Sequence, residues 1–361
     1  MKRKGLLIVS ICFIGLMGCG VEKHILEEIL IAEVVGFDEE ENNQIKGTTV
    51  VSVSRPGVEA TRGKDVYQMV SHSIKDVRQT IGKEAPFPIV GGRLDVILYG
   101  EKLARKGLNS FMDTHHRDPN LGRDIFIGIV EGQADKVVKE EAKMTKTAGV
   151  YLKELIEHNT KTNLPENNFH SFFYSSHGKG MDPVVPLLTV KGDKVEIKGI
   201  ALMKKDVYIG EYIPFNQGIL FKSLYERPKG GSFELKWKEN SYINISNVSS
   251  NSNYEISNAN DRPSVKISVK MKGRLIEIQG YDLYKKPDIK KIEAIAERDL
   301  QRKMKDMVNK FQEYDIDPLA IGDRARSKTR NFNQKHWEDI YPTIPITVEL
   351  DLVLIHEGIS E

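Results

Sequence analysis

The sequence predicts a multi-domain protein of the α+β class, with mixed α/β character in its first half. Apolar runs at 94–99 and 125–130 alternate there with helical patterns, whereas the second half is rich in the alternating pattern of strands. One long amphipathic helix is predicted over 290–311, packed on a sheet. A length of 361 residues suits two or three domains. We expect one domain at 19–190 and another at 191–361, the second open to further subdivision.

The first predicted element of the body is a β-hairpin. Residues 29–37 are mostly apolar, 38–43 are acidic and polar, and 48–54 resume with β-branched residues, which indicates two strands around a solvated turn. The acids of this turn lack the ligand spacing and central glycine of a calcium loop. A helix packed on the hairpin is predicted from residue 64 by apolar residues at helical spacing, namely Val66, Val70, Ile74, Val77 and Ile81.

The middle of the chain continues the alternation. After a strand at 94–99, a helix is predicted beyond residue 100, then a strand at 125–130 and a helix from residue 134. Two further helices are expected at 144–159 and at 165–178, the latter starting at Pro165. The two prolines within 182–186 predict an extended connector.

The second half predicts a sheet covered by a helix. Strands are expected at 195–203 and 207–209, 233–238, 265–278 and 344–354. The Asn- and Ser-rich segment 240–260 suits either polar edge strands or a long loop. Acids and bases mix on the polar side of the 290–311 helix, which favours packing across the sheet over lying on a membrane.

Composition places the chain among globular proteins, with 40% hydrophobic and 29% charged residues. A net charge of +2 gives no indication of a nucleic-acid-binding surface. The two cysteines are Cys12 and Cys19, both near the N-terminus. If both are removed or modified, the body folds without a disulfide and depends on packing.

The first residues have the layout of a secretory signal. Three basic residues precede a short apolar stretch at 6–17, and Leu16-Met17-Gly18-Cys19 resembles the bacterial lipobox. We therefore expect a lipoprotein signal peptide at 1–18 and lipid attachment at Cys19. The alternative is an ordinary signal peptide that happens to contain a cysteine. The apolar stretch is too short to span a bilayer as a helix.

The search for chemistry finds no catalytic, metal or cofactor signature. His115 and His116 are adjacent and point in different directions, so they are expected to be a surface pair rather than metal ligands. Residues 315–318 are explained as a helix start, with aspartate capping and proline in the first turn. Carboxylates distant in the sequence can meet in a cleft, and the most exposed candidates for a cryptic hydrolytic site lie in the charged connection between the predicted helix and strand, at Arg117, Asp118, Arg123 and Asp124. We predict instead that these residues form a solvated surface with local ion pairs.

Four segments together resemble the Ger(x)C family, the lipoprotein subunits of bacterial spore germinant receptors. They are the lipobox and three others: GEKLARKGL at 100–108, like the family's G-E-x-L-A-x-x-G-L, GIALMKKD at 199–206, like its G-x-A-x-F-K-x-D hairpin, and DPLAIG at 317–322, like its D-P-L-G-F-G turn. Two departures are visible: residues 20–24 lack the Trp-Asp pair and Arg-rich stretch of many members, and Ala320 and Ile321 replace Gly and Phe.

The resemblance implies a non-catalytic, lipid-anchored subunit on the outer leaflet of the spore inner membrane. In the family this subunit assembles with a transporter-like integral subunit and a membrane subunit that bears a soluble domain, and it is required for nutrient-triggered germination. The runner-up is a solute-binding lipoprotein that itself grips a nutrient between two lobes. Such proteins repeat βα units in both lobes, whereas the second half here is strand-rich. An exported enzyme is the third hypothesis.

Overall fold

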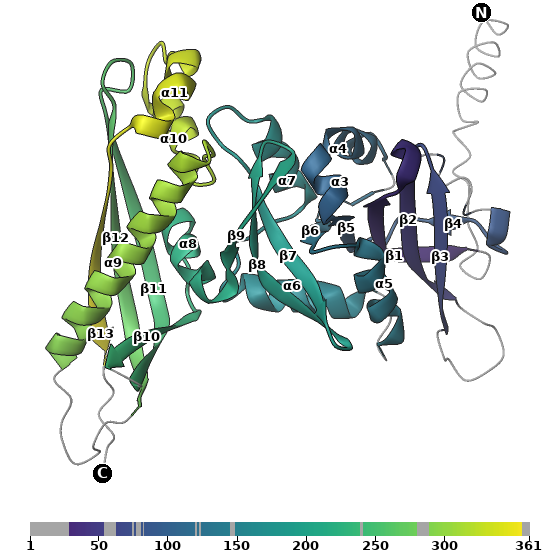
Figure 1. The fold of residues 1–361 in the computed structure, drawn as a ribbon, viewed down its shortest axis with the longest axis horizontal. Helices are drawn as coiled ribbons and strands as arrows, with labels where there is room; N and C mark the ends of the chain where they lie inside the picture. The colour runs from purple at the N-terminus through teal and green to yellow at the C-terminus, as the bar shows by residue number, and fades with distance from the viewer. Residues whose placement is uncertain are drawn as a thin grey trace, which may run out of the picture.

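The computed structural model describes residues 29–53, 63–73, 76, 81, 83–119, 121–122, 124–144, 149–238, 241–279 and 289–355. These residues build two β-sheets that lie one after the other along the long axis of the molecule (Figure 1). The larger sheet and its helices lie within residues 30–214 and make up the first half of the body, and the smaller sheet with the longest helix lies within residues 218–355, the second half. The α+β class predicted from the sequence is confirmed.

The first sheet contains nine strands in the order β3-β2-β1-β5-β6-β7-β8-β9, with β4 beside the start of β1. Strands β1, β5, β6 and β7 run parallel, and the outer strands are added as antiparallel hairpins. The bounds are β1 Leu30–Glu39, β2 Ile45–Val53, β3 Gly63–Ser71, β4 Ile89–Val90, β5 Val96–Gly100, β6 Phe126–Val130, β7 Val184–Lys191, β8 Lys194–Lys204 and β9 Val207–Pro214.

Helices cover both faces of this sheet. One face carries α3 (Glu101–Lys106), α4 (Asn109–His116) and α7 (Phe169–His177), and the other carries α5 (Ala134–Lys143) and α6 (Val150–Thr160). Because parallel strands are buried on both sides, β5 and β6 are continuous apolar runs instead of alternating ones. Their side chains pack in two hydrophobic cores on opposite faces of the sheet, one that contains Tyr99 and Phe172 and one that contains Leu98 and Val138.

The second sheet has four strands in the order β10-β11-β12-β13, and α9 crosses one face of it (Figure 1). In β13 alternate side chains are buried and exposed, so the inner row faces α9. The inner side of α9 buries Ile292, Ala296, Leu300, Met304, Met307, Val308 and Phe311. The bounds are β10 Ser232–Lys238, β11 Ser241–Ser257, β12 Ser264–Ile278, β13 Ile346–Ile355, α8 Gly218–Tyr225, α9 Ile289–Glu313, α10 Ile321–Lys328 and α11 Gln334–Ile340.

Helix α9 also covers the outer edge of β13. Three of its polar side chains, spaced four residues apart, accept hydrogen bonds from alternate backbone N–H groups of that strand. The bonds are Leu350 N to Gln301 Oε1 at 3.0 Å, Leu352 N to Glu297 Oε2 at 3.0 Å and Leu354 N to Glu293 Oε2 at 2.7 Å. The edge is therefore satisfied from within the chain, which protects it against pairing with another strand.

Several predicted elements are confirmed: the β1–β2 hairpin, the β8–β9 hairpin, α9 and the terminal strand β13. The helix predicted from residue 64 is wrong over its first part, where β3 pairs along its length with β2. The pattern misled because Val66 and Val70, four residues apart, share a face in a strand as well as in a helix. Residues 76, 81, 83 and 84 are helical, and most of the remaining predicted span lies outside the described residues.

Other boundaries differ for local reasons. Helix α6 begins at Val150 instead of residue 144, and α7 begins at Phe169 because Asn168 and Ser171 form a capping box there. The Asn-rich segment is neither a loop nor an edge strand, since β11 pairs with β10 on one side and β12 on the other. The connector at 182–186 becomes strand β7 from Val184. The expected domain limit at residue 190 stays a prediction; it falls within β7, near the end of that strand, which pairs with β8.

The α9 ladder gives a stability prediction. Glu297→Ala removes the acceptor for the N–H of Leu352, and we expect it to destabilise the fold by about 1 kcal/mol. Arg298→Ala, at the next and exposed position of α9, is the matched control. Thermal unfolding followed by circular dichroism measures both variants. Equal melting temperatures for Glu297→Ala and the wild type would contradict a contribution of the ladder to stability.

Candidate functional site

The two halves of the molecule are joined by the carboxylate of Asp182, in the connection between α7 and β7. Its Oδ1 accepts a hydrogen bond of 2.8 Å from the backbone N–H of Lys205, at the tip of the β8–β9 hairpin. Its Oδ2 accepts a bond of 2.8 Å from the N–H of Asp317, in the turn before α10. The N–H of Asp182 donates in return to the carbonyl of Asp317 at 2.9 Å. One side chain thus holds a turn from each half.

The hairpin tip adds further bonds across the same junction. The Lys205 ammonium donates to the carbonyls of Gly178 at 2.6 Å and Met181 at 3.1 Å, which fixes the connection that carries Asp182. The neighbouring Lys204 forms an ion pair with Asp315, on the side of the second sheet. Both partners of this pair are about half exposed, so it contributes little to stability.

Asp317 organises the turn that begins α10. Its carboxylate accepts the backbone N–H groups of Ile321 at 2.9 Å and Gly322 at 2.7 Å, which are donors at the free start of the helix. The capping role predicted for aspartate in 315–318 is confirmed. The predicted helix start is wrong, because α10 begins at Ile321 and Pro318 lies in the turn before it.

Glycine is required where the two halves touch most closely. A Cβ atom on Gly322 would lie 2.7 Å from the Cα of Gly180 and 2.8 Å from Nε1 of Trp337, distances that real Cβ atoms do not adopt. The N–H of Asp323 donates to the carbonyl of Gly180 at 2.8 Å in the same contact. The backbone of the 317–322 turn therefore packs directly on the α7–β7 connection.

The 100–108 segment contacts the same β8–β9 hairpin. Asp206, which ends the 199–206 segment, accepts the N–H of Asn109 on its Oδ2 at 2.8 Å, and its carbonyl accepts the N–H of Leu108 at 3.1 Å. These residues form the end of the 100–108 segment and the start of α4. The three segments that carry the family resemblance in the body thus meet around one hairpin.

Burial sets the protonation of this junction. Asp317 is buried, and burial raises its pKa to about 7, against the opposing effect of the N–H groups of Gly322 and Ile321. Burial likewise raises the pKa of Asp182, against its bonds to Asp317 and Lys205. The neighbouring charge of Asp182 also raises the pKa of Asp317, because two carboxylates close together repel each other.

A surface cavity of about 370 Å³ opens beside the junction. Its walls carry charges of both signs, of which Lys204 and Asp315 form an ion pair. The lining residues are Gly180, Met181, Asp182, Lys204, Lys205, Asp315, Asp317, Trp337, Glu338, Asp339 and Tyr341.

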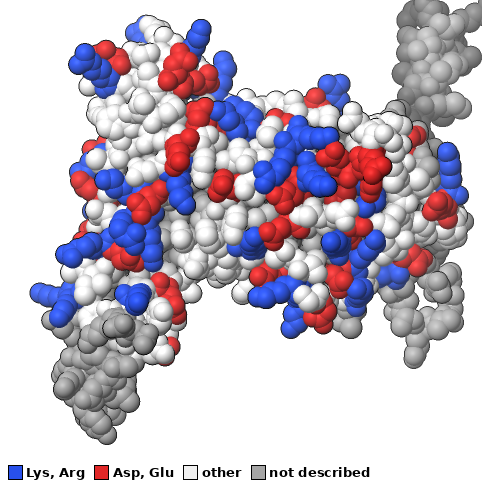
Figure 2. Space-filling model, viewed as in Figure 1, with Lys and Arg blue, Asp and Glu red and all other residues white. Residues whose placement is uncertain are grey.

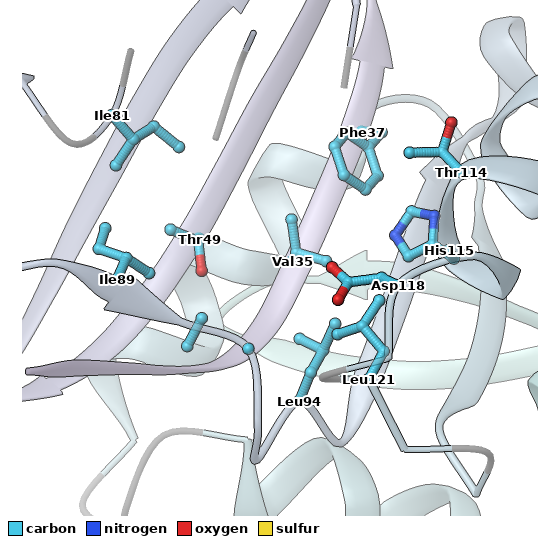
Figure 3. Close-up of a pocket in the computed structure, with 12 residues that line it drawn as sticks. Val35, Phe37, Thr49, Ile81, Ile89, Leu94, Thr114, His115, Asp118 and Leu121 are labelled. Carbon is cyan, nitrogen blue, oxygen red and sulfur yellow. The ribbon is translucent and has the colours of Figure 1, made fainter. Parts of the chain in front are cut away.

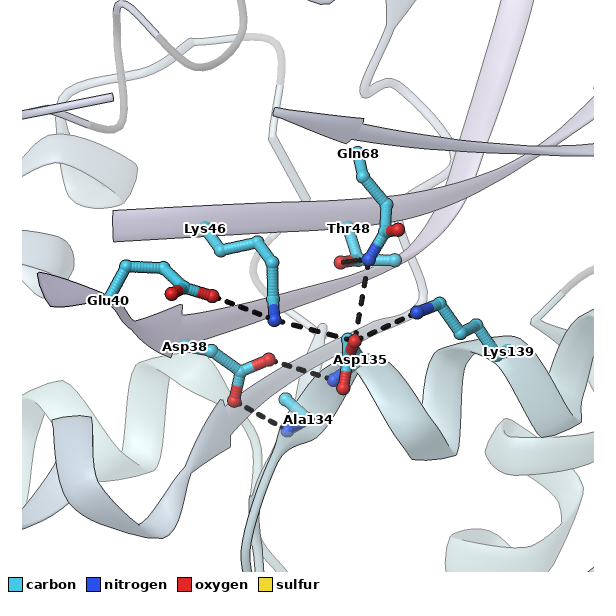
Figure 4. Close-up of polar contacts among 8 residues, drawn as sticks. All are labelled: Asp38, Glu40, Lys46, Thr48, Gln68, Ala134, Asp135 and Lys139. Atoms are coloured by element: carbon cyan, nitrogen blue, oxygen red, sulfur yellow. Dashed lines mark hydrogen bonds and ion pairs between the residues drawn. The ribbon is translucent and has the colours of Figure 1, made fainter. Parts of the chain in front are cut away.

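A second buried carboxylate, Asp38, joins the first sheet to α5 (Figure 4). Its two oxygens accept the N–H groups of Ala134 at 2.6 Å and Asp135 at 2.9 Å, at the start of the helix. The solvated turn predicted at 38–43 is therefore wrong for Asp38, which is buried because it caps a helix. The same contact explains Gly100, whose Cβ would overlap the Asp38 carboxylate.

Charged side chains extend this contact outward, as Figure 4 shows. Asp135 pairs with Lys46 at 3.4 Å and with Lys139 at 2.9 Å, and it accepts a bond from Gln68 at 3.4 Å. Burial alone would raise the pKa of Asp135, but Lys139 and Lys46 outweigh it, so the pKa is lowered. Lys46 also pairs with Glu40 at 2.9 Å. The network ties β2, β3 and α5 together.

An apolar cavity of about 70 Å³ lies between the first hairpin and α4 (Figure 3). His115 and Asp118 border it. The expectation that His115 is a surface residue is wrong: it is buried, and its Nδ1 lies 2.7 Å from the carbonyl of Phe111. His116 is exposed as expected and stacks on Phe173 with ring centroids 4.3 Å apart. The cavity also contacts Ala32, Val35, Phe37, Thr49, Ile81, Ile89, Gly91, Leu94, Thr114 and Leu121.

The remaining candidates for chemistry do not share one cleft. Asp118 borders the apolar cavity, whereas Asp124 is exposed and lines a different cavity near α6. Arg117 is exposed, and Arg123 lies outside the described residues. In the part of the chain that the structure describes, no three His, Cys, Asp or Glu side chains gather to hold a metal ion. The predicted lipid site, Cys19, also lies outside the described residues.

No helix among the described residues is both long and apolar enough to span a bilayer. On the face seen in Figure 2, acidic and basic side chains are interspersed over both sheets. This view shows no continuous basic surface of the kind that binds nucleic acid.

Two family models match almost the whole body. Residues 22–190 match the spore germination protein N-terminal domain, and residues 198–358 match the spore germination B3/GerAC-like C-terminal domain. The chain belongs to the Ger(x)C family of spore germination proteins. The family resemblance found in the sequence is therefore confirmed.

Individual relatives agree with this assignment. The chain is similar to the spore germination protein GerQC of Bacillus cereus, with 26% identity over 365 residues that cover 100% of both chains. It is 21% identical to YfkR of Bacillus subtilis over 274 residues, 73% of this chain and 70% of that protein. The crystal structure of the GerBC protein shares the fold, with a TM-score of 0.59 at 19% identity over 89% of this chain and 96% of GerBC.

Sequence reasoning about this Ger(x)C member found the turns of the junction but missed the side chain that joins them. Asp182 was placed only in an extended connector, and Asp38 only in a solvated turn. A weak signal exists for both, since each aspartate directly adjoins a buried apolar strand, where an unpartnered charge is costly. Their partners, however, are far away along the chain.

The buried carboxyl of Asp317 predicts a pH-dependent stability. Its pKa of about 7 in the folded protein exceeds its ordinary value of 3.8, so the folded state binds more protons between these pH values. This contribution is present below pH 4 and is lost as the pH rises toward 7, by at most about 1.4 kcal/mol per pH unit. Asp317→Asn should flatten that decline in denaturant unfolding measured from pH 4 to 8.

Asp315→Asn is the matched control, because Asp315 lies two residues away and is about half exposed. It should leave the pH dependence of unfolding as in the wild type. If Asp317→Asn also leaves that dependence unchanged, the carboxyl does not titrate in the folded protein as proposed.

Proposed function

We propose that this protein is a non-catalytic, lipid-anchored subunit of a spore germinant receptor. In this role it supports nutrient-triggered germination by assembling or signalling with integral membrane subunits. Membership of the Ger(x)C family and the similarity to GerQC support the receptor role. The structural observation that carries the proposal is the junction, which joins both halves into one body.

The two halves share a hydrophobic core as well as the Asp182 contact. Side chains from β7, β8 and β9 and from the loop before α7 pack in the same cluster as α9 and β13. The members from the first half include Leu164, Val184, Ile197, Ile200, Leu202 and Ile213. A body joined in this way moves as a unit, so a displacement at one end reaches the other. Such a body suits a subunit that transmits or supports an assembly.

The alternative is a solute-binding lipoprotein, and one observation favours it. The 370 Å³ cavity beside the junction is large enough for a small nutrient and carries both carboxylates and lysines. Against it, a two-lobed binding protein closes around its ligand by hinge motion. Here the corresponding region holds interlocked backbone turns and a common core.

The membrane attachment completes the proposal. Lipid on Cys19 would hold the body at the outer leaflet of the spore inner membrane, and several acyl chains give durable attachment where one chain binds only marginally. Residues 20–29 would then link the anchor to β1, which begins at Leu30.

One experiment on the tagged full-length chain tests the proposal. The wild-type protein, expressed in sporulating cells, should incorporate labelled palmitate and co-purify from detergent extracts with the integral receptor subunits. Cys19→Ala should abolish palmitate labelling, because the acylated thiol is gone. Labelling that survives the change would refute the anchor, and a wild-type chain that purifies without receptor subunits would refute the assembly role.

Calorimetry of the same purified chain separates the alternative. Titration with candidate amino acids and sugars should give no binding heat at submillimolar concentrations. Submillimolar binding that is lost in Lys205→Ala, a change in the wall of the cavity beside the junction, would favour the solute-binding protein.

A further inference from the structure

Among the described strands, β3, β9, β10 and β13 stand at the ends of the two sheet orders, and the last three of these are protected. The edge of β13 is covered by the polar ladder of α9. Strand β10 exposes charged side chains at Glu234 and Lys236. Strand β9 lies against α3, where the guanidinium of Arg105 packs over the ring of Tyr208 at 5.3 Å. Charges and covering helices are the devices that keep sheet edges from pairing with foreign strands.

Strand β3 differs from these three. It is nine residues long, and among the described strands it pairs with β2 alone. Two valines on the face toward α5 are exposed, Val66 by 39% and Val70 by 43%, with the exposed Gln68 between them. A long edge strand with exposed apolar side chains is a template for strand addition, since one row of its N–H and C=O groups points away from the sheet.

A surface groove beside β3 adds a charge preference. Val66 borders it together with the exposed side of α5, and its volume is about 490 Å³. The other lining residues are Lys136, Lys139, Glu140, Ala142, Lys143 and Val190. Two of the three lysines pair with acids of α5, Lys139 with Asp135 at 2.9 Å and Lys143 with Glu140 at 2.6 Å. Lys136 leaves this side of the groove with a net positive charge, which favours a partner with acidic side chains next to its apolar ones.

Strand β3 lies near the start of β1 and therefore near the predicted lipid anchor. Through the pairing of β1, β2 and β3, Lys64 lies opposite Ser52, which lies opposite Ile31 near the start of β1. Neighbouring strands are about 4.8 Å apart, so the β3 edge lies about 10 Å from β1. The eleven residues from Cys19 to Leu30 span at most about 40 Å when fully extended. A lipid on Cys19 would therefore keep this edge close to the bilayer.

We infer that the outer edge of β3 is a docking site for an extended segment of an integral receptor subunit. The segment adds to the first sheet as a further strand, with alternate apolar side chains against Val66 and Val70 and acidic side chains toward the lysines of α5. Backbone hydrogen bonds supply the affinity, and the side chains supply the selectivity. This inference rests on the proposed receptor function and names the surface through which the subunit assembles.

The cysteine content of the chain permits a direct crosslinking test. The natural cysteines are Cys12 and Cys19, in the signal and at the anchor, so Val66→Cys introduces a unique thiol in the body. A maleimide–benzophenone reagent attached there in the full-length chain, in native membranes, should give a photo-adduct with an integral receptor subunit. Val353→Cys is the matched control, because Val353 is a valine exposed by 48% on the second sheet. We expect at least about tenfold more adduct from position 66.

A second pair of variants tests the same edge without a reagent. Val66→Asp combined with Val70→Asp should lower the co-purified receptor subunits about tenfold, because two acidic side chains oppose an acidic partner strand. The melting temperature should stay within a few degrees of the wild type, since both valines are exposed. Val353→Asp should leave co-purification unchanged.

The outcomes separate the two proposals. If the wild-type chain does not co-purify with receptor subunits, the receptor function fails. If it does, but position 66 gives no adduct, gives adduct equal to position 353, or crosslinks only to a second copy of this chain, the docking site on β3 is wrong. Normal co-purification of the folded Val66→Asp/Val70→Asp variant would overturn it as well.

Discussion

The structure depends on one partly buried carboxylate that is shared by two turns. Asp182 uses both oxygens and its own N–H to hold the tip of the β8–β9 hairpin and the turn before α10. If that carboxylate were removed, backbone donors from both halves would lose their acceptor in a partly buried contact, which is costly. The common core then packs around a junction whose geometry these bonds have fixed. The relative placement of the two sheets follows from this contact.

The same device recurs in the first half. Asp38 ends a buried strand and caps α5, much as Asp317 caps α10. In each case a buried acid satisfies helix N–H groups that packing alone would leave without partners. Glycines stand where these carboxylates and turns need space, at Gly100 and Gly322. The segments that carry the family resemblance in the sequence are therefore mainly parts that assemble the fold.

The sequence predicted long periodic elements well and long-range contacts poorly. Helix α9 and strand β13 were predictable because their patterns run unbroken over many residues. Strand β3 was missed because apolar residues four positions apart lie on one face of a strand as well as of a helix. Asp182 and Asp38 were missed because their partners lie 135 and 96 residues away in the chain. The resemblance located the turns at 199–206 and 317–322, but no pattern in the sequence showed that they meet.

The central claim is that the junction makes both halves one cooperative unit, and scanning calorimetry of the full-length protein tests it most directly. The wild type should unfold in a single transition whose calorimetric and van't Hoff enthalpies agree. Asp182→Ala should lower the transition temperature and separate it into two, one for each sheet with its helices. Two independent transitions in the wild type, or an Asp182→Ala variant that unfolds exactly as the wild type does, would contradict the account.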